Sequence, residues 1–118
     1  LKKTILYHGT GDEVREYIHV RDAADLSVKM LSEEYKNKNV MLSGPTAMCY
    51  RDILEMINEI LGSNIKITYS RKSSETHYKL SPYNYKKPEI GRKIFNNHYI
   101  ELGVGLIECM EEISRKVK

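Results

Sequence analysis

Apolar residues recur along this chain at two spacings, one typical of short strands and one typical of amphipathic helices. Apolar residues that alternate or run together over four or five positions predict strands, because successive strand side chains point to opposite faces of a sheet. Apolar residues three and four positions apart predict helices that bury one face. We therefore expect strands at 4–7, 16–20, 39–43 and 65–69, helices at 22–35 and 50–61, and a terminal helix marked by Leu106, Ile107, Met110, Ile113 and Val117.

The two internal helices are expected to pack through apolar stripes. In the clearer one, Gly62 stands where a helix stop is expected. Its apolar face consists of Tyr50, Ile53, Leu54, Ile57, Ile60 and Leu61. In the helix predicted at 22–35, a core-facing stripe is expected from Ala24, Val28, Leu31 and Tyr35.

The segment that leads into the first helix places unusual side chains together. If residues 15–20 form a strand, Arg15, Tyr17 and His19 share one face, and the apolar residues share the other. A guanidinium, a phenol and an imidazole on one face suit an anionic ligand that bears a ring. Arg15 is therefore the candidate ligand contact, and the alternative is a surface ion pair with Asp12, Glu13 or Glu16.

The neighbouring polar residues have simpler interpretations. His19 is expected to be a hydrogen-bonded structural imidazole, because the sequence places no serine or carboxylate partner beside it for acid–base chemistry. Asp22 is expected to cap or begin the helix that follows the strand. Neither residue is predicted to be catalytic.

The segment resembles the start of the C-terminal part of the extended short-chain dehydrogenase/reductase family, the NAD-dependent epimerases and dehydratases of nucleotide sugars. The signature is Arg-x-Tyr/Phe-Ile-His-Val-x-Asp-x-Ala, and a weaker similarity covers most of residues 5–75. This chain supplies the signature with Arg15, Tyr17, Ile18, His19, Val20, Asp22 and Ala24.

The resemblance implies an α/β fold class, a small C-terminal substrate-binding domain with short strands and three main helices. It implies that Arg15 contacts the diphosphate of a nucleotide sugar and that Tyr17 lies against the ligand. An approximate match further along implies that Arg71 contacts the diphosphate and Glu75 the ribose hydroxyls. The parent enzyme would be an isomerase, lyase or oxidoreductase of carbohydrate biosynthesis with NAD or NADP as cofactor.

This family's chemistry depends on two motifs, a glycine-rich dinucleotide loop and a Tyr-x-x-x-Lys pair. Segments of this chain that match them in part lie in surroundings that do not suit either role. Gly9-x-Gly11 precedes carboxylates and a strand, whereas a dinucleotide pyrophosphate needs a further glycine and a helix N-terminus. Gly103-Val104-Gly105 is expected to begin a helix, and Tyr83-x-x-x-Lys87 is bracketed by prolines that oppose a continuous helical turn. We therefore expect one domain over residues 1–118, cofactor and catalytic residues on an absent N-terminal Rossmann domain, and no catalysis by this fragment alone.

Positive charge is concentrated between residues 71 and 98, where seven Lys/Arg face only two Glu. The region is suited to close over phosphates. Its interleaved tyrosines, Tyr78, Tyr83 and Tyr85, also suit base stacking, but no RNA-binding motif or recognition-helix pattern accompanies them, so no nucleic-acid partner is expected. The alternative function is a free-standing basic module that binds a protein or nucleic acid. A third is a family member that keeps the fold as an assembly surface.

The remaining composition limits the chemistry further. Cys49 and Cys109 are expected to be buried free thiols, and the histidines and cysteines lack metal-ligand spacing, so no metal is implied. With 41% hydrophobic and 30% charged residues, no apolar run of about 18 residues and no leader sequence, a cytoplasmic protein without a membrane partner is expected. An oligomer remains open.

Overall fold

A computed structural model of the chain describes residues 3–70 and 91–117. The chain forms two compact units. Unit 1 consists of Leu1–Arg15 and Met48–Ser81, and unit 2 consists of Glu16–Ala47 and Pro82–Lys118. The short strands and three main helices confirm the expected α/β fold class.

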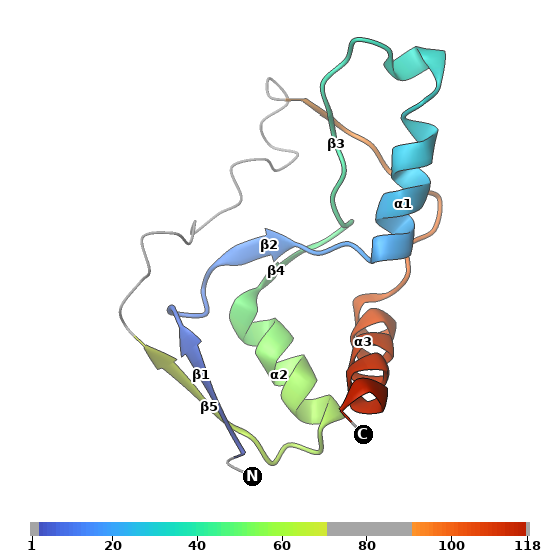
Figure 1. Ribbon diagram of the computed structural model, residues 1–118. Helices are drawn as coiled ribbons and strands as arrows, with labels where there is room; N and C mark the ends of the chain where they lie inside the picture. Colours follow the sequence, from blue (N-terminus) through green and yellow to red (C-terminus); the bar gives the residue numbers. More distant parts are fainter. Residues whose placement is uncertain (1–2, 71–90, 118) are drawn as a thin grey trace. The chain divides into compact units, whose positions relative to one another are not determined.

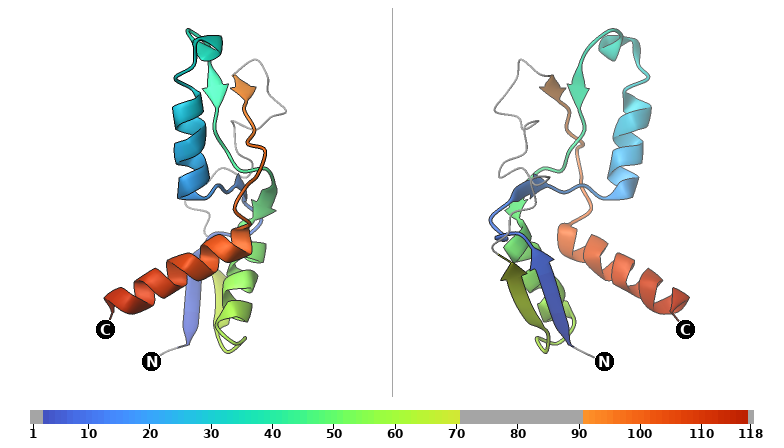
Figure 2. Two further views of the ribbon diagram at one scale, coloured as in Figure 1. Left: turned by 90° about the vertical axis from the view of Figure 1, so that its right-hand side faces the viewer. Right: turned by 60° about the vertical axis from the view of Figure 1, so that its left-hand side comes forward.

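Unit 1 is built on a parallel strand pair, β1 (Thr4–His8) and β5 (Lys66–Ser70). Thr4 is opposite Lys66 and His8 is opposite Ser70. Parallel strands need a long connection, and the helix α2 (Tyr50–Ile60) within this connection lies alongside the pair (Figures 1 and 2). Both strands and the helix agree with the sequence prediction to within one residue at each end.

The C-terminus of α2 shows why the sequence located it so well. Gly62 has a φ of 87°, the left-handed conformation that glycine adopts without a Cβ penalty. The Gly62 amide donates to the Glu59 carbonyl at 3.0 Å, and the Ser63 amide donates to the Asn58 carbonyl at 2.8 Å. These two bonds form a Schellman motif, which satisfies carbonyls left free at a helix end.

Two shorter strands, β2 (Val14–Glu16) and β4 (Ala47–Cys49), form another two-stranded sheet, and the chain passes between the units within them. The prediction of a strand at 16–20 was wrong. The strand ends at Glu16, and His19 is the N-cap of the next helix, its Nδ1 accepting a hydrogen bond from the Arg21 amide at 3.2 Å. Capping therefore takes precedence over strand alternation in this segment.

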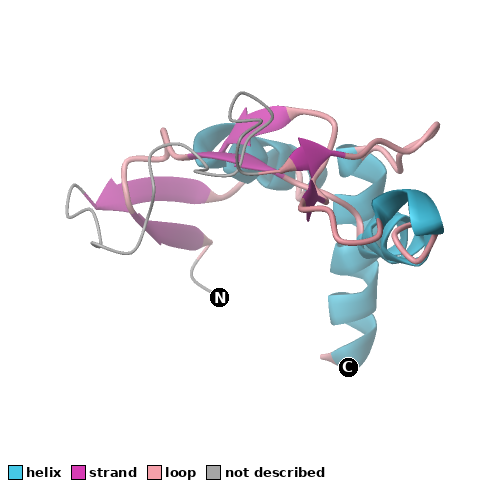
Figure 3. Cartoon of the chain, turned by 90° about the horizontal axis from the view of Figure 1, so that it is seen from above, coloured by secondary structure: helices cyan, strands magenta, loops and turns pink. Residues whose placement is uncertain are grey.

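Unit 2 contains α1 (Val20–Lys29), the 3-10 turn η1 (Glu33–Tyr35), and the short parallel strands β3 (Val40–Met41) and β6 (Arg92–Lys93). Figure 2 shows α1 beside β3. The predicted helix at 22–35 ends early, because the amides of residues 31 and 32 donate to carbonyls three residues back and tighten the chain. Figure 3 shows the loops that join the short strands to the helices.

The core-facing stripe predicted for α1 was also wrong. Val28 is 69% exposed and Leu31 is 84% exposed, whereas Leu26 is fully buried. Asp22 is buried four residues before Leu26, on the same face, and accepts a hydrogen bond from the Ile100 amide at 2.8 Å. Because this hydrogen bond satisfies the Asp22 carboxylate, the face of α1 that carries Asp22 and Leu26 is the buried one.

The helix α3 (Leu102–Lys116) completes unit 2 and begins where the glycine pair predicted a helix start. Its last turn holds Arg115 and Lys116, which complement the helix dipole as expected. Cys49 and Cys109 are free, but Cys109 is exposed and Cys49 half-buried, so the prediction of two buried thiols was wrong. Among the described residues, no helix has the length and apolar character needed to cross a membrane.

Candidate functional site

The turn between β1 and β2 is organised around a buried carboxylate. Glu13 is 4% exposed and accepts hydrogen bonds from the Gly11 amide at 2.9 Å, the Thr10 amide at 3.2 Å and the Tyr7 hydroxyl at 3.4 Å. Gly11 has a φ of 84°, and a Cβ there would lie 2.7 Å from the Tyr69 ring. The turn therefore requires glycine at this position, and the carboxylate fixes the amides that precede it.

The same hydrogen bonds determine the ionisation of this pair. Burial favours the neutral form of Glu13, but donation from the backbone amides and from Tyr7 outweighs it and lowers the pKa of Glu13 below its usual 4.5. Burial, followed by the Glu13 and Tyr50 charges, raises the pKa of Tyr7 to about 12. At neutral pH the turn thus contains a carboxylate and a neutral phenol.

Three tyrosines from β1, α2 and β5 gather beside this turn. The Tyr7 and Tyr50 rings stack with centroids 5.0 Å apart, and the Tyr69 ring meets Tyr7 edge-on at 6.1 Å. The Arg51 guanidinium lies 4.9 Å from the Tyr69 ring centroid, a cation–π arrangement. Burial raises the pKa of Tyr69, with the positive charge of Arg51 opposing it. Rings and guanidinium provide stacking surfaces at one end of unit 1.

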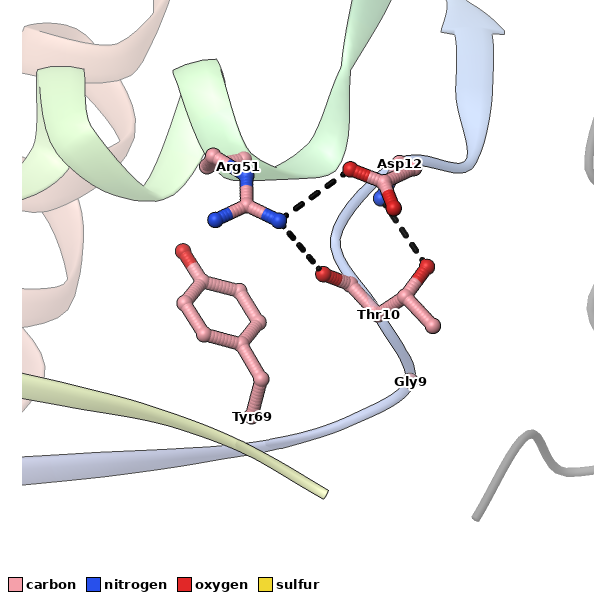
Figure 4. A pocket seen from close by; sticks show the side chains of 5 residues that line it. All are labelled: Gly9, Thr10, Asp12, Arg51 and Tyr69. Carbon is pink, nitrogen blue, oxygen red and sulfur yellow. Dashed lines mark hydrogen bonds and ion pairs between the residues drawn. The ribbon is translucent and has the colours of Figure 1, made fainter. Parts of the chain in front are cut away.

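A pocket of about 260 Å³ opens next to these rings (Figure 4). Arg51 lies on one side of it and donates to the Asp12 carboxylate at 3.1 Å and to the Thr10 carbonyl at 3.0 Å. The pocket combines one tyrosine ring, a guanidinium and a carboxylate, and it is lined by Gly9, Thr10, Asp12, Arg51 and Tyr69.

Arg15, the main residue predicted from sequence, is part of the same unit. It is the central residue of β2, half-buried, and its Nη1 donates to the Val14 carbonyl at 2.7 Å. Its positive charge opposes the rise in the pKa of Tyr7, so it is within electrostatic range of the tyrosine cluster. Asp12, one of the acids considered as an ion-pair partner of Arg15, pairs with Arg51.

Of the other predicted site residues, the structure describes Tyr17 alone. Tyr17 follows β2 within unit 2, and its backbone carbonyl packs closely against Gly44. The strand predicted to carry Arg15, Tyr17 and His19 on one face ends at Glu16, before Tyr17. Arg71 and Glu75 lie outside the described residues.

Sequence reasoning missed several residues of this site. Glu13 had a local signal, because an acid two residues after a Gly-Thr-Gly turn is well placed to accept the turn's amides. Arg51 and Tyr69 had none, because their stacking depends on α2 and β5 meeting across 18 residues of chain.

Neither glycine pair fits a dinucleotide pyrophosphate. The amides of Thr10 and Gly11, which a pyrophosphate would need, already donate to the Glu13 carboxylate. Gly103 and Gly105 lie inside α3, where the Gly105 amide donates to the Glu101 carbonyl. The described residues also contain no group of three His, Cys, Asp or Glu placed to hold a metal ion.

Comparison with known proteins finds a family model that matches part of the chain and a solved structure with a similar fold. Residues 1–42 match the model of the NAD dependent epimerase/dehydratase family. No curated protein matches the chain. The fold is similar to that of a GDP-6-OMe-4-keto-L-xylo-heptose reductase from C. jejuni, with a TM-score of 0.68 and 23% identity, over 98% of this chain and 35% of the reductase. The chain therefore spans about a third of that reductase's length.

Proposed function

We propose that this chain, whose residues 1–42 match the model of the NAD dependent epimerase/dehydratase family, forms the nucleotide-sugar-binding part of an NAD(P)-dependent sugar epimerase, dehydratase or reductase. In this proposal Arg15 binds the substrate diphosphate, and the chain does not catalyse the reaction alone. The NAD(P) cofactor and the proton-transfer residues belong to a dinucleotide-binding domain outside this chain, which is its main partner in the cytoplasm.

The observation that supports this proposal most is the placement of Arg15, half-buried, on β2 and within the residues that match the family model. A half-buried guanidinium binds a diphosphate more strongly than an exposed one, because less water competes for it. Its planar donors also match two phosphate oxygens at once, which a lysine cannot reproduce.

The other predicted residues have supporting roles in the proposal. Tyr17 lies against the ligand, and Arg71 with Glu75 contacts its diphosphate and its ribose. The aromatic rings and Arg51 of unit 1 offer flat surfaces for a ring-bearing ligand. The isolated chain is expected to bind weakly, because it supplies only part of the contacts and preorganisation.

Calorimetric titration of GDP and UDP against the wild-type chain and Arg15→Gln tests the proposal. A lost charge-assisted contact is expected to weaken diphosphate binding by about tenfold or more. Arg115→Gln is the matched control, since Arg115 is an exposed arginine paired with Glu111 on α3. Equal affinities of wild type and Arg15→Gln contradict the proposal.

The alternative of a basic interaction module predicts a different result. Oligonucleotide binding driven by the basic region weakens steeply as salt is added, because it depends on counterion release. Tight, salt-sensitive binding to an oligonucleotide with no preference for GDP or UDP over inorganic phosphate would favour that alternative.

A further inference from the structure

A second buried carboxylate follows Arg15 directly in β2. Glu16 and Lys93 form an ion pair at 3.1 Å, with side chains only 5% and 4% exposed. Lys93 also donates to the Gly44 carbonyl at 2.7 Å, and the Ser43 hydroxyl donates to the Glu16 carboxylate at 2.6 Å. Three segments of unit 2 thus meet at one carboxylate: the end of β2, the connection between β3 and β4, and β6.

The side chains of β2 provide little apolar burial that would specify its register. β2 has three residues, and none of its side chains belongs to the buried apolar core of the described residues. Register in a strand is strongly specified only when one face is clearly buried, and a slip of one residue moves every side chain to the opposite face. Burial of the Glu16 charge with a cation penalises such a slip, because a slipped Glu16 would separate its carboxylate from the buried ammonium of Lys93.

We propose that Lys93 is a positioning residue for Arg15: its buried pair with Glu16 sets the register of β2 and so fixes the face on which Arg15 lies. Successive strand residues point to opposite faces, so Glu16 directed toward Lys93 directs Arg15 away from it. What Arg15 then contacts rests on the proposed diphosphate-binding function, whereas the register of β2 does not.

The double variant Glu16→Gln/Lys93→Met tests this assignment by removing both charges of the buried pair together. Affinities for GDP and for guanosine are measured with the wild-type chain, the double variant, Arg15→Gln and the triple combination. GDP binding of the double variant is expected to fall by about tenfold, as for a lost charge-assisted contact, while guanosine binding stays the same. In the Arg15→Gln background the double change is expected to have no further effect, which is the signature of coupled residues.

The matched control is Glu112→Gln/Lys116→Met, the same chemical change at an exposed pair on α3. It is expected to leave both affinities at their wild-type values. A loss of GDP affinity in the double variant that adds fully to the loss in Arg15→Gln would overturn the positioning role.

Hydrogen exchange provides a readout that does not depend on any ligand. The amides of β2 are expected to exchange faster in Glu16→Gln/Lys93→Met, while those of α2 keep their wild-type rates. Ser43→Ala, which removes a single donor to Glu16, is expected to accelerate the same amides by a smaller factor, and it serves if the double variant does not fold. Unchanged exchange in β2 refutes the inference. The two proposals can fail separately. If β2 exchanges faster in Glu16→Gln/Lys93→Met but wild type and Arg15→Gln bind GDP equally, the proposed function is rejected and Lys93 remains the residue that holds β2 in register.

Discussion

The two units each bury a glutamate close to Arg15, but they stabilise it in different ways. In unit 1, Glu13 is surrounded by neutral donors, the amides of its own turn and the Tyr7 hydroxyl. In unit 2, Glu16 is paired with a lysine and a serine hydroxyl. Backbone donors come with the turn and cannot be mutated away, whereas a buried cation is a single side chain. The comparison indicates that unit 2 is the more vulnerable to one substitution.

The largest effect is expected from Lys93→Met. Removing the cation leaves the Glu16 carboxylate buried without a counter-charge, which costs about 3–5 kcal/mol of unfolding free energy. Adding Glu16→Gln is expected to restore most of this loss. Urea unfolding of the two variants measures both values. An unchanged midpoint for Lys93→Met would contradict the greater vulnerability of unit 2 to one substitution.

The next effect tests where the apolar core of unit 2 lies. Leu26→Ala is expected to lower the unfolding free energy by about 2–5 kcal/mol, because Leu26 is fully buried. Leu31→Ala is the matched control, and because Leu31 is exposed its change is expected to stay within about 0.5 kcal/mol. Equal losses of unfolding free energy in the two variants would support the buried stripe predicted from sequence.

Glu13→Gln is expected to have a smaller effect, about 1–3 kcal/mol, because an uncharged acceptor replaces a carboxylate among donors that remain. The pKa of Glu13 is lower in the folded chain than its usual 4.5. Its contribution is therefore fully present above about pH 4.5 and is lost as the pH falls through the folded-state pKa. Unfolding measured between neutral and acidic pH should converge for wild type and Glu13→Gln, and a constant difference would contradict this.

The smallest effect is expected at the rim of the pocket. Asp12→Asn removes the partner of Arg51 in an exposed ion pair, and such pairs contribute little in water. No measurable change in the urea midpoint is expected. A loss comparable to that of Glu13→Gln would show that the pocket rim stabilises unit 1.

The same comparison explains which parts of the fold the sequence predicted. Local signals succeeded: the Gly62 stop of α2 and the basic last turn of α3 depend on residues a few positions apart. The prediction of the buried face of α1 failed, because the Asp22 carboxylate bonds the amide of Ile100, 78 residues away. The pair between Glu16 and Lys93 spans 77 residues and had no local pattern at all.

The candidate site divides in the same way. Arg15 was predicted because a family signature surrounds it, and its ligand contact stays a prediction, although the structure does place it on a strand. The prediction of a strand that continues through Tyr17 failed, because β2 ends at Glu16 and His19 already caps the next helix. Arg51 and Tyr69 were missed, because a cation–π contact between a helix and a distant strand leaves no spacing to recognise.

The most direct test of the central claim, that Arg15 binds a diphosphate, is phosphorus NMR of GDP titrated with the chain. We expect both phosphorus resonances to shift with wild type and with Arg115→Gln, and to stay at their free positions with Arg15→Gln at the same concentrations. Identical shifts with wild type and Arg15→Gln would contradict the claim.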